Sequence, residues 1–250
     1  MTWLTPTIAT AFGLIFGSFL SMLIPRLHHG QKGIVTGRSQ CPACKHVLGA
    51  AELIPLFSFL LQRGRCKACK KPISFWYPAT ELTLLALSLG LAYLSPDPKE
   101  WLTLFPLVFV ICFVFIYDLR YKEIHEAVLI PGILYAVLWG AFTHTWQDLA
   151  LAMGFAALFF GLQFLLSKGR WIGSGDIEIG LFMGAILGWP LILPGIFLSY
   201  LLGSLIGSAL LLTKKARGES ALPLGPFLMV GTVLSFVWGE KLISLYLSSL

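Results

Sequence analysis

Six residues of the chain have the types and the spacing that chemistry requires: four cysteines and two aspartates. The cysteines form two CxxC pairs separated by 21 residues, Cys41-Pro-Ala-Cys44 and Cys66-Lys-Ala-Cys69. Asp118 ends an apolar run, and Asp176 follows two glycines, Gly173 and Gly175, at the start of another. Paired CxxC motifs are typical of a zinc site, and two carboxylates that meet can exchange protons with a substrate.

The composition indicates where this chemistry takes place. Of 250 residues, 57% are hydrophobic and 12% are charged, whereas soluble domains carry about a quarter charged residues. A soluble core cannot bury so much apolar surface, so a water-soluble enzyme and a disordered chain are both excluded. We predict an all-α polytopic membrane protein.

Hydrophobic segments predict about eight transmembrane helices, given about 20 residues per span. The predicted segments are Trp3–Ile24, Phe75–Leu94, Trp101–Tyr117, Glu126–Phe142, Leu149–Leu166, Ile177–Trp189, Leu191–Leu212 and Leu222–Leu247. The sixth is short, and only Trp189-Pro190 separates it from the seventh. These two segments could therefore be two helices or one broken helix.

The Lys and Arg residues predict the orientation. Residues 25–75 hold nine of the 18 basic residues against one acid, Glu52, which gives this loop a charge of +8. Cytoplasmic loops carry such an excess, so we expect the loop inside and the N-terminus outside. The predicted organisation is a first transmembrane helix at 1–24, a cytoplasmic zinc-binding loop at 25–75, and helices carrying the aspartates at 76–250. The basic charge then faces anionic membrane lipid, and nucleic acid is not an expected partner.

The four cysteines are predicted to hold a structural Zn²⁺ ion. Four thiolates complete a tetrahedral site and leave no position open for catalysis. Two disulfides are the alternative, but a cytoplasmic loop keeps its thiols reduced. Between the pairs, the apolar segment Leu53–Leu61 is too short to span and is predicted to lie at the membrane interface.

The two aspartates are predicted to act together. Carboxylates are costly near lipid, which makes them functional candidates. For Asp118 the structural alternative is an ion pair with Arg120 or Lys122, and for Asp176 it is a helix cap. Two neighbouring carboxylates share one proton and titrate as a unit, as in an aspartic protease. Glu81 is predicted instead to bond a neighbouring helix or backbone group.

The two members of the pair have different predicted roles. Asp176 is expected to be the ionised partner, because a helix N-terminus favours negative charge. Gly173 and Gly175 would let the backbone come close to a substrate strand.

These residues resemble the type IV prepilin leader peptidases, membrane aspartic proteases of bacterial pilus and type II secretion systems. The resemblance is carried by Gly17-Ser-Phe-Leu20, both CxxC pairs, Arg63-Gly-Arg-Cys66, Ile73-Ser-Phe-Trp-Tyr-Pro78 with Glu81, Asp118-Leu, Gly173-Ser-Gly-Asp176 and Leu222-Pro-Leu-Gly-Pro-Phe227. It implies eight helices and catalytic roles for Asp118 and Asp176. It also implies cleavage, at the cytoplasmic face of the bacterial inner membrane, of the short basic leader of prepilins or pseudopilins.

The resemblance further implies N-methylation of the new N-terminus with S-adenosylmethionine, because members with a four-cysteine loop usually have this activity. No residue is assigned to that cofactor, and no oligomeric state is predicted. The chain departs from the family pattern at Glu52-Leu53, at His125-Glu126 and at Glu178. Four acids are candidates to hold the basic leader: Glu123, Glu126, Glu178 and Glu219.

Two other functions fit some of these features. The Tyr117-Asp118 and Gly-x-Gly-Asp motifs are also similar to those of the presenilin and signal peptide peptidase group, but the Pro-Ala-Leu motif of that group is replaced here by Leu222-Pro-Leu-Gly-Pro226. A noncatalytic zinc-ribbon membrane scaffold, with both aspartates as caps and ion-pair partners, is the second alternative. Replacing either aspartate distinguishes the scaffold from an enzyme.

Overall fold

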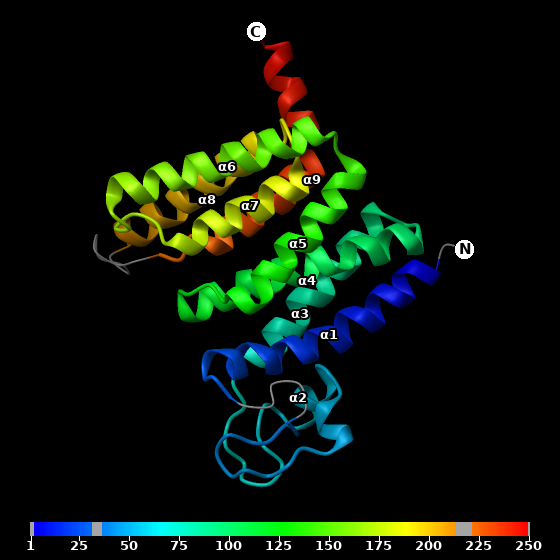
Figure 1. Cartoon of the computed structure of the whole chain (residues 1–250). Helices are drawn as coiled ribbons and strands as arrows, with labels where there is room; N and C mark the ends of the chain where they lie inside the picture. The colour runs from blue at the N-terminus through cyan, green and yellow to red at the C-terminus, as the bar shows by residue number, and fades with distance from the viewer. Residues whose placement is uncertain (1–2, 32–36, 214–221, 250) are drawn as a thin grey trace. The chain divides into compact units, whose positions relative to one another are not determined.

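The computed structural model describes residues 3–31, 37–213 and 222–249, and within these ranges the chain is helical (Figure 1). The helical elements in these ranges are α1 (Leu4–His28), η1 (Ala50–Leu53), α2 (Phe57–Leu61), α3 (Trp76–Leu94), α4 (Pro98–Tyr121), α5 (Glu126–Thr143), α6 (Trp146–Ser167), α7 (Ser174–Leu187), α8 (Ile192–Leu212) and α9 (Gly225–Ser248). The prediction of an all-α membrane protein is confirmed.

Seven helices of the described part of the chain are long and apolar enough to cross a membrane: α1, α3, α4, α5, α6, α8 and α9. All eight predicted segments are present as helices, but the sixth, α7, has 14 residues. At 1.5 Å per residue it is about 21 Å long, less than the roughly 30 Å of a bilayer core. The sixth and seventh segments are separate helices, because the chain leaves α7 after Leu187 and enters α8 at Ile192.

The chain divides into two compact units, Met1–Phe113 and Val114–Leu250, with the division inside α4. The first unit holds α1, α3 and the loop with the four cysteines. The second holds the end of α4 and helices α5 to α9, and it contains both aspartates. The three-part division at residues 24 and 75 stays a prediction.

In the first unit, α1 packs closely along α3 because small residues face the contact. A Cβ atom added to Gly13 would lie 2.9 Å from Cα of Leu85, and one added to Gly17 would lie 3.0 Å from Cα of Glu81. The Ser88 hydroxyl then donates to the carbonyl oxygen of Ala9 at 2.8 Å. Without a hydrophobic force between helices in lipid, such close backbone packing and interhelical hydrogen bonds hold them together.

Glu81 of α3 forms a hydrogen bond with the cysteine-containing loop. Its side chain, 7% exposed, accepts a hydrogen bond at 2.8 Å from the backbone N–H of Leu56, just before α2. Leu56 has φ +60° and ψ −49°, a positive-φ conformation that is unfavourable for leucine. The hydrogen bond therefore holds a strained turn in place, and the predicted bond of Glu81 to a backbone group is confirmed.

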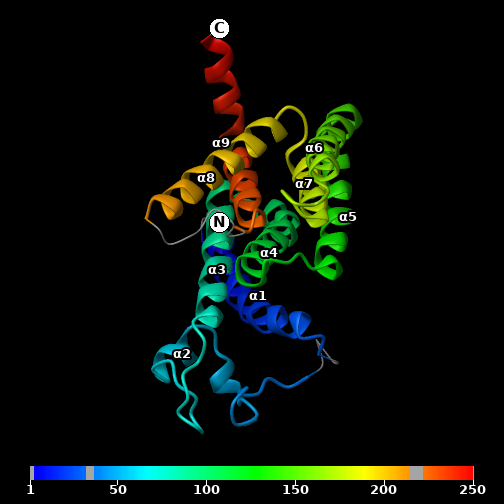
Figure 2. The same ribbon diagram turned by 90° about the vertical axis from the view of Figure 1, so that its left-hand side faces the viewer.

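In the second unit, the short helix α7 is the central element. It contacts α5, α6, α8 and α9, and nine of its 14 residues are buried (Figures 1 and 2). Close approach to α6 depends on Gly184, where an added Cβ would lie 3.0 Å from the backbone of Ala152. A helix covered on this many sides needs neither the length nor the lipid-facing surface of a full span.

Replacing Glu81 by alanine should release α2 from the helix pair. The partly buried Leu56 amide would lose its partner, which costs about 1 kcal/mol. We expect faster amide hydrogen exchange and faster proteolysis at residues 54–61, while α1 and α3 remain protected. Glu100→Ala, at an exposed helix position, is the matched control. Unchanged protection of residues 54–61 in Glu81→Ala would contradict the anchoring role.

Candidate active site and metal centre

Asp118 lies in the last turn of α4, with 5% of its surface exposed. Its Oδ2 accepts a hydrogen bond at 2.8 Å from the backbone N–H of Gly225, the first residue of α9. The guanidinium of Arg120, an expected ion-pair partner, lies over the ring of Tyr121 at 4.9 Å from the centroid. Asp118 thus sits against the N-terminus of a second helix, where amide groups and the helix dipole favour an anion.

Asp176 lies in the first turn of α7 and is 7% exposed. Its Oδ2 accepts a hydrogen bond at 2.9 Å from the backbone N–H of Gly173, the residue that precedes the helix. Asp176 therefore caps its own helix, as the structural alternative predicted. That cap occupies one of its two carboxylate oxygens.

The two carboxylates have matching surroundings. Each is buried, and each has its Oδ2 bonded to one backbone amide at a helix N-terminus. Within the described residues, neither Oδ1 has a recorded hydrogen-bond partner. The charge of Asp176 also acts on Asp118, so the two side chains lie within electrostatic reach of each other. The arrangement leaves one oxygen of each carboxylate for water or a substrate.

The two glycines before Asp176 have distinct structural roles. Gly173 supplies the amide that holds Asp176. An added Cβ at Gly175 would lie 2.5 Å from Cδ1 and 2.9 Å from Cβ of Ile124, which belongs to the connection after α4. Gly175 thus allows the segment that follows Asp118 to pack directly on the segment that carries Asp176. The predicted approach of a substrate strand to these glycines stays a prediction.

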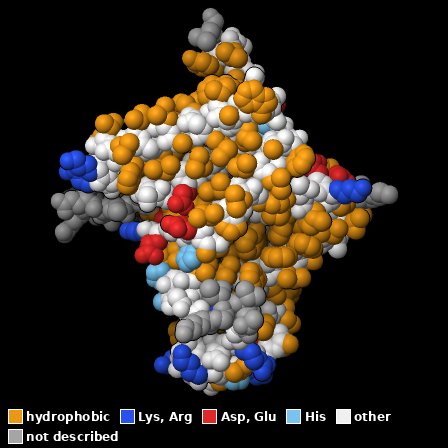
Figure 3. Space-filling model, viewed as in Figure 1, with side chains coloured by type: hydrophobic (Ala, Val, Ile, Leu, Met, Phe, Trp, Pro, Cys, Tyr) orange, Lys and Arg blue, Asp and Glu red, His pale blue; other side chains and the backbone are white. Residues whose placement is uncertain are grey.

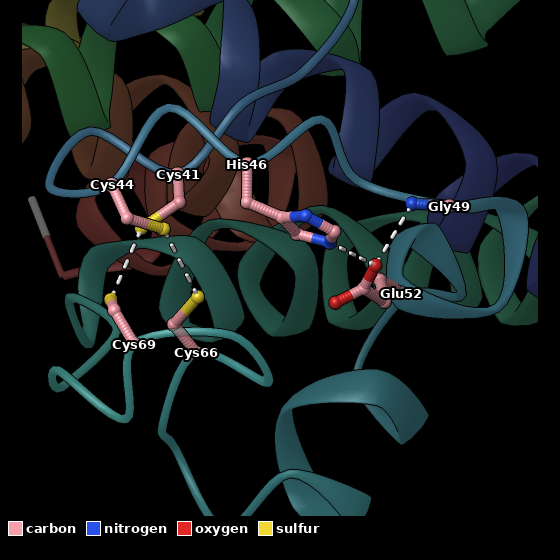
Figure 4. A network of polar contacts seen from close by, with 7 residues as sticks. All are labelled: Cys41, Cys44, His46, Gly49, Glu52, Cys66 and Cys69. Carbon is pink, nitrogen blue, oxygen red and sulfur yellow. Dashed lines mark hydrogen bonds and ion pairs between the residues drawn. The ribbon is translucent and has the colours of Figure 1, made fainter.

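In the first unit, the four cysteines converge at one point (Figure 4). Their sulfur atoms all lie within 4.8 Å of one another, with 3.9 Å between Cys41 and Cys69 and 4.0 Å between Cys44 and Cys66. A tetrahedral zinc ion with Zn–S bonds of about 2.3 Å sets its sulfurs about 3.8 Å apart. The four thiols are free rather than disulfide-bonded, and their spacing fits such an ion.

Each CxxC pair is shaped by the same backbone turn. The N–H of Cys41 bonds the carbonyl of His46, and that of Cys66 bonds the carbonyl of Lys71, both at 2.9 Å. A left-handed lysine follows the second cysteine of each pair, with φ +60° at Lys45 and +59° at Lys70. The backbone amide of Cys44 lowers the pKa of the Cys41 thiol to about 6, whereas desolvation and the neighbouring thiols raise the pKa of Cys44 to about 11. Of these two thiols, Cys41 is therefore the one that more readily forms the thiolate that a metal requires.

A polar network joins the first pair to the rest of the loop (Figure 4). Nε2 of His46 lies 3.2 Å from Oε2 of Glu52, and the same oxygen accepts a hydrogen bond from the Gly49 N–H at 2.9 Å. The Gly49 amide lowers the pKa of Glu52, with a smaller contribution from His46. His46 is thus a hydrogen-bond partner of Glu52, and the candidate metal-binding group of the described residues consists of the four cysteines.

Comparison with known proteins identifies the family of this chain. Residues 11–95 match the model described as the bacterial Peptidase A24 N-terminal domain, and residues 102–208 match the type IV leader peptidase family. A protein of Bacillus subtilis (strain 168), named prepilin leader peptidase/N-methyltransferase, is 34% identical over 242 residues, which cover 94% of this chain and 95% of the relative. The chain belongs to the type IV leader peptidase family.

Relatives from other bacteria agree with this assignment. Proteins of the same name from Pseudomonas putida and Aeromonas hydrophila are each 29% identical to the chain. The alignments cover 94% and 100% of the chain, and 91% and 96% of the relatives. No solved structure matches the chain. The family predicted from the sequence motifs is confirmed.

Gly225 is the residue of this site to which the sequence assigned no role. It lies in Leu222-Pro-Leu-Gly-Pro-Phe227, which supported the resemblance but offered no side chain that could do chemistry. Its contribution is the backbone amide that holds Asp118, and Pro226 in the first turn of α9 helps to fix where that helix begins. The signal available in the sequence was a Gly-Pro pair at the start of an apolar segment.

Replacing Gly225 by alanine should displace Asp118. The added Cβ would lie 2.6 Å from Oδ2 and 3.2 Å from Cγ of Asp118, and overpacking of this kind costs about 1–3 kcal/mol. We expect lower thermal stability of the detergent-solubilised protein, together with a loss of any activity that needs Asp118. Gly161→Ala, in α6 with nothing within 4 Å of the added atom, is the control. Equal effects of the two variants would contradict the proposed contact.

Proposed function

We propose that this chain is an aspartic endopeptidase that removes the leader peptide of type IV prepilins and pseudopilins, with Asp118 and Asp176 as the catalytic pair. One observation carries the catalytic assignment: two buried carboxylates from different helices, each fixed by a single backbone amide and each with one oxygen left over. The substrate class follows from the names of the relatives.

The proposed reaction uses the pair as one acid and one base. Two like charges in close proximity are unfavourable, so the pair holds a single proton. The ionised carboxylate takes a proton from a water molecule as that water attacks the peptide carbonyl carbon, and the protonated carboxyl donates its proton to the carbonyl oxygen. Transfer of a proton to the leaving nitrogen then accompanies cleavage of the C–N bond.

The helix dipole does not determine which aspartate is ionised. A helix N-terminus lies beside Asp176, as expected, and Asp118 has an equivalent one at the start of α9. The dipole effect therefore acts on both carboxylates. We assign the shared proton to the pair and not to either residue.

We further propose that acids near the pair attract the basic leader. Glu123 and Glu126 follow Asp118 along the chain, and the charge of Glu126 acts on Glu178, two residues after Asp176. Acidic side chains gather with histidine on the face shown in Figure 3. Glu219, the fourth candidate, lies outside the described residues. Charge-reversal variants of Glu126 and Glu178 that cleave a precursor as well as the wild type would contradict this role.

The cleavage site is proposed to face the cytoplasm of a bacterial inner membrane, with the N-terminus outside. This orientation rests on the excess of Lys and Arg in residues 25–75. We also propose a second activity, N-methylation of the new N-terminus with S-adenosylmethionine, on the basis of the relatives' names. The residues that would hold this cofactor are not assigned.

We propose that the metal of the cysteine cluster is Zn²⁺ in a structural role. Four thiolates at tetrahedral spacing suit zinc and leave no open position for a water molecule. The ion would hold together a loop whose regular structure, in its described part, consists of η1, α2 and isolated β-bridges. The carboxylates in the second unit need no metal in the proposed reaction.

Cleavage of a pilin-type precursor by the lipid-reconstituted protein tests the catalytic pair. Asp118→Asn and Asp176→Asn keep the side-chain shape but remove the titrating proton, and we expect each to slow cleavage by about 10²–10⁴-fold. Asp97→Asn, at an exposed position, should cleave normally. Normal cleavage by either active-site variant while it remains folded would contradict the pair. A folded wild-type protein that cleaves no precursor would favour the noncatalytic scaffold.

Metal removal tests the zinc assignment. We expect one zinc ion per chain by elemental analysis, and its loss in Cys44→Ser or after prolonged chelation. Because binding and folding of such sites are coupled, residues 41–71 should then become sensitive to protease while the helical content is unchanged. Cys112→Ala, which alters a buried cysteine of α4, should keep its zinc. An intact loop in the metal-free protein would overturn the structural role.

A further inference from the structure

The cysteine-containing loop carries a pocket that the proposed reactions do not use. Its volume is about 800 Å³, and it lies between η1, α2 and the second CxxC pair. The residues that line it are Ala51, Glu52, Ser58, Leu61, Gln62, Arg63, Arg65, Lys67 and Lys70. Four of these nine side chains are positively charged and one is negatively charged.

The positive charge of the pocket exceeds its negative charge. Glu52 already has partners in His46 and the Gly49 amide. Among the described residues, the four cations have no recorded ion pair, and all four are exposed. Arg63 also adopts a left-handed conformation with φ +51°, which glycine would adopt at lower energy. The pocket therefore presents four clustered cations against a single carboxylate, Glu52, whose charge acts on Lys67.

One side of the pocket borders an apolar surface. Phe57, Leu60 and Leu61 of α2 are 60%, 69% and 82% exposed. Leu56, just before α2, is hydrogen-bonded to Glu81 of α3. Glu81 lies five residues after the start of α3, or about 7.5 Å along the helix axis. The exposed side chains of α2 are thus held beside a helix long and apolar enough to cross the membrane.

We propose that this pocket binds the phosphate headgroup of an anionic phospholipid from the surrounding bilayer, with the acyl chains lying against the exposed face of α2. Clustered Lys and Arg beside an apolar surface are the features that recognise such a headgroup. The bound lipid also supplies the negative charge that a loop of charge +8 needs if a basic leader is to approach it.

The charge of the pocket argues against the methyl donor as its occupant. S-adenosylmethionine carries a sulfonium and an ammonium group against one carboxylate, so its net charge is positive. Four cations around the pocket would repel it. A free phosphate ion would match the charge but would leave the apolar face of α2 uncovered. The lipid satisfies both features.

Lipid retention by the full-length protein tests this site. The protein is placed in nanodiscs of mixed phosphatidylcholine and phosphatidylglycerol, and the lipids that stay bound after release are counted by native mass spectrometry. We expect the wild type to retain phosphatidylglycerol selectively. Arg63→Gln with Lys67→Gln should weaken this binding by roughly 30-fold, since each basic residue near a membrane contributes about a factor of five.

Two control pairs test whether lipid retention depends on the position and the charge of the replaced residues. Lys99→Gln with Lys241→Gln removes the same charge from exposed positions elsewhere and should retain the lipid. The charge-conserving pair Arg63→Lys with Lys67→Arg should also retain it, and zinc content reports whether each loop is folded. Equal loss in the control pair would overturn the pocket as the site. Displacement of the lipid by millimolar inorganic phosphate or by S-adenosylmethionine would overturn the lipid as its occupant.

Discussion

The need of a buried carboxylate for hydrogen bonds governs this structure. Asp118 and Asp176 are removed from water, and each receives one bond from the backbone amide of a glycine at a helix N-terminus. Those amides are available only because α7 begins after Gly173 and α9 begins at Gly225. The glycines also leave room, since a side chain at Gly175 would collide with Ile124 and one at Gly225 with Asp118. The starts of these two helices therefore determine the geometry of the site.

The cysteine cluster, the helices and the two aspartates could be predicted because short sequence patterns indicate each of them. Two CxxC pairs 21 residues apart predict one tetrahedral site, and the same backbone turn at each pair brings the four sulfurs within 4.8 Å. The helices follow from apolar runs, since a segment in lipid must satisfy its own backbone. The two aspartates could be found because acids are rare in such a sequence.

Other features depend on contacts between distant segments and could not be predicted in the same way. Gly225 acts through its backbone amide and its lack of a side chain, and neither property shows from the sequence which distant carboxylate it meets. The Glu81 carboxylate reaches the Leu56 amide across 25 positions, and composition alone could not identify that partner. The short length of α7 followed from hydropathy, but its burial among four other helices depends on contacts that the sequence does not show.

In the proposed mechanism, Asp118 and Asp176 hold one proton between them. Infrared difference spectroscopy of the lipid-reconstituted protein at neutral pH measures this directly, by comparing the wild type with Asp118→Asn and with Asp176→Asn. We expect a protonated carboxyl band of the wild type to disappear in both variants, because the remaining aspartate ionises once its charged neighbour is gone. Any contribution of Glu81 to the carboxyl bands is common to all three spectra. Identical carboxyl bands in the wild type and both variants would contradict the shared proton.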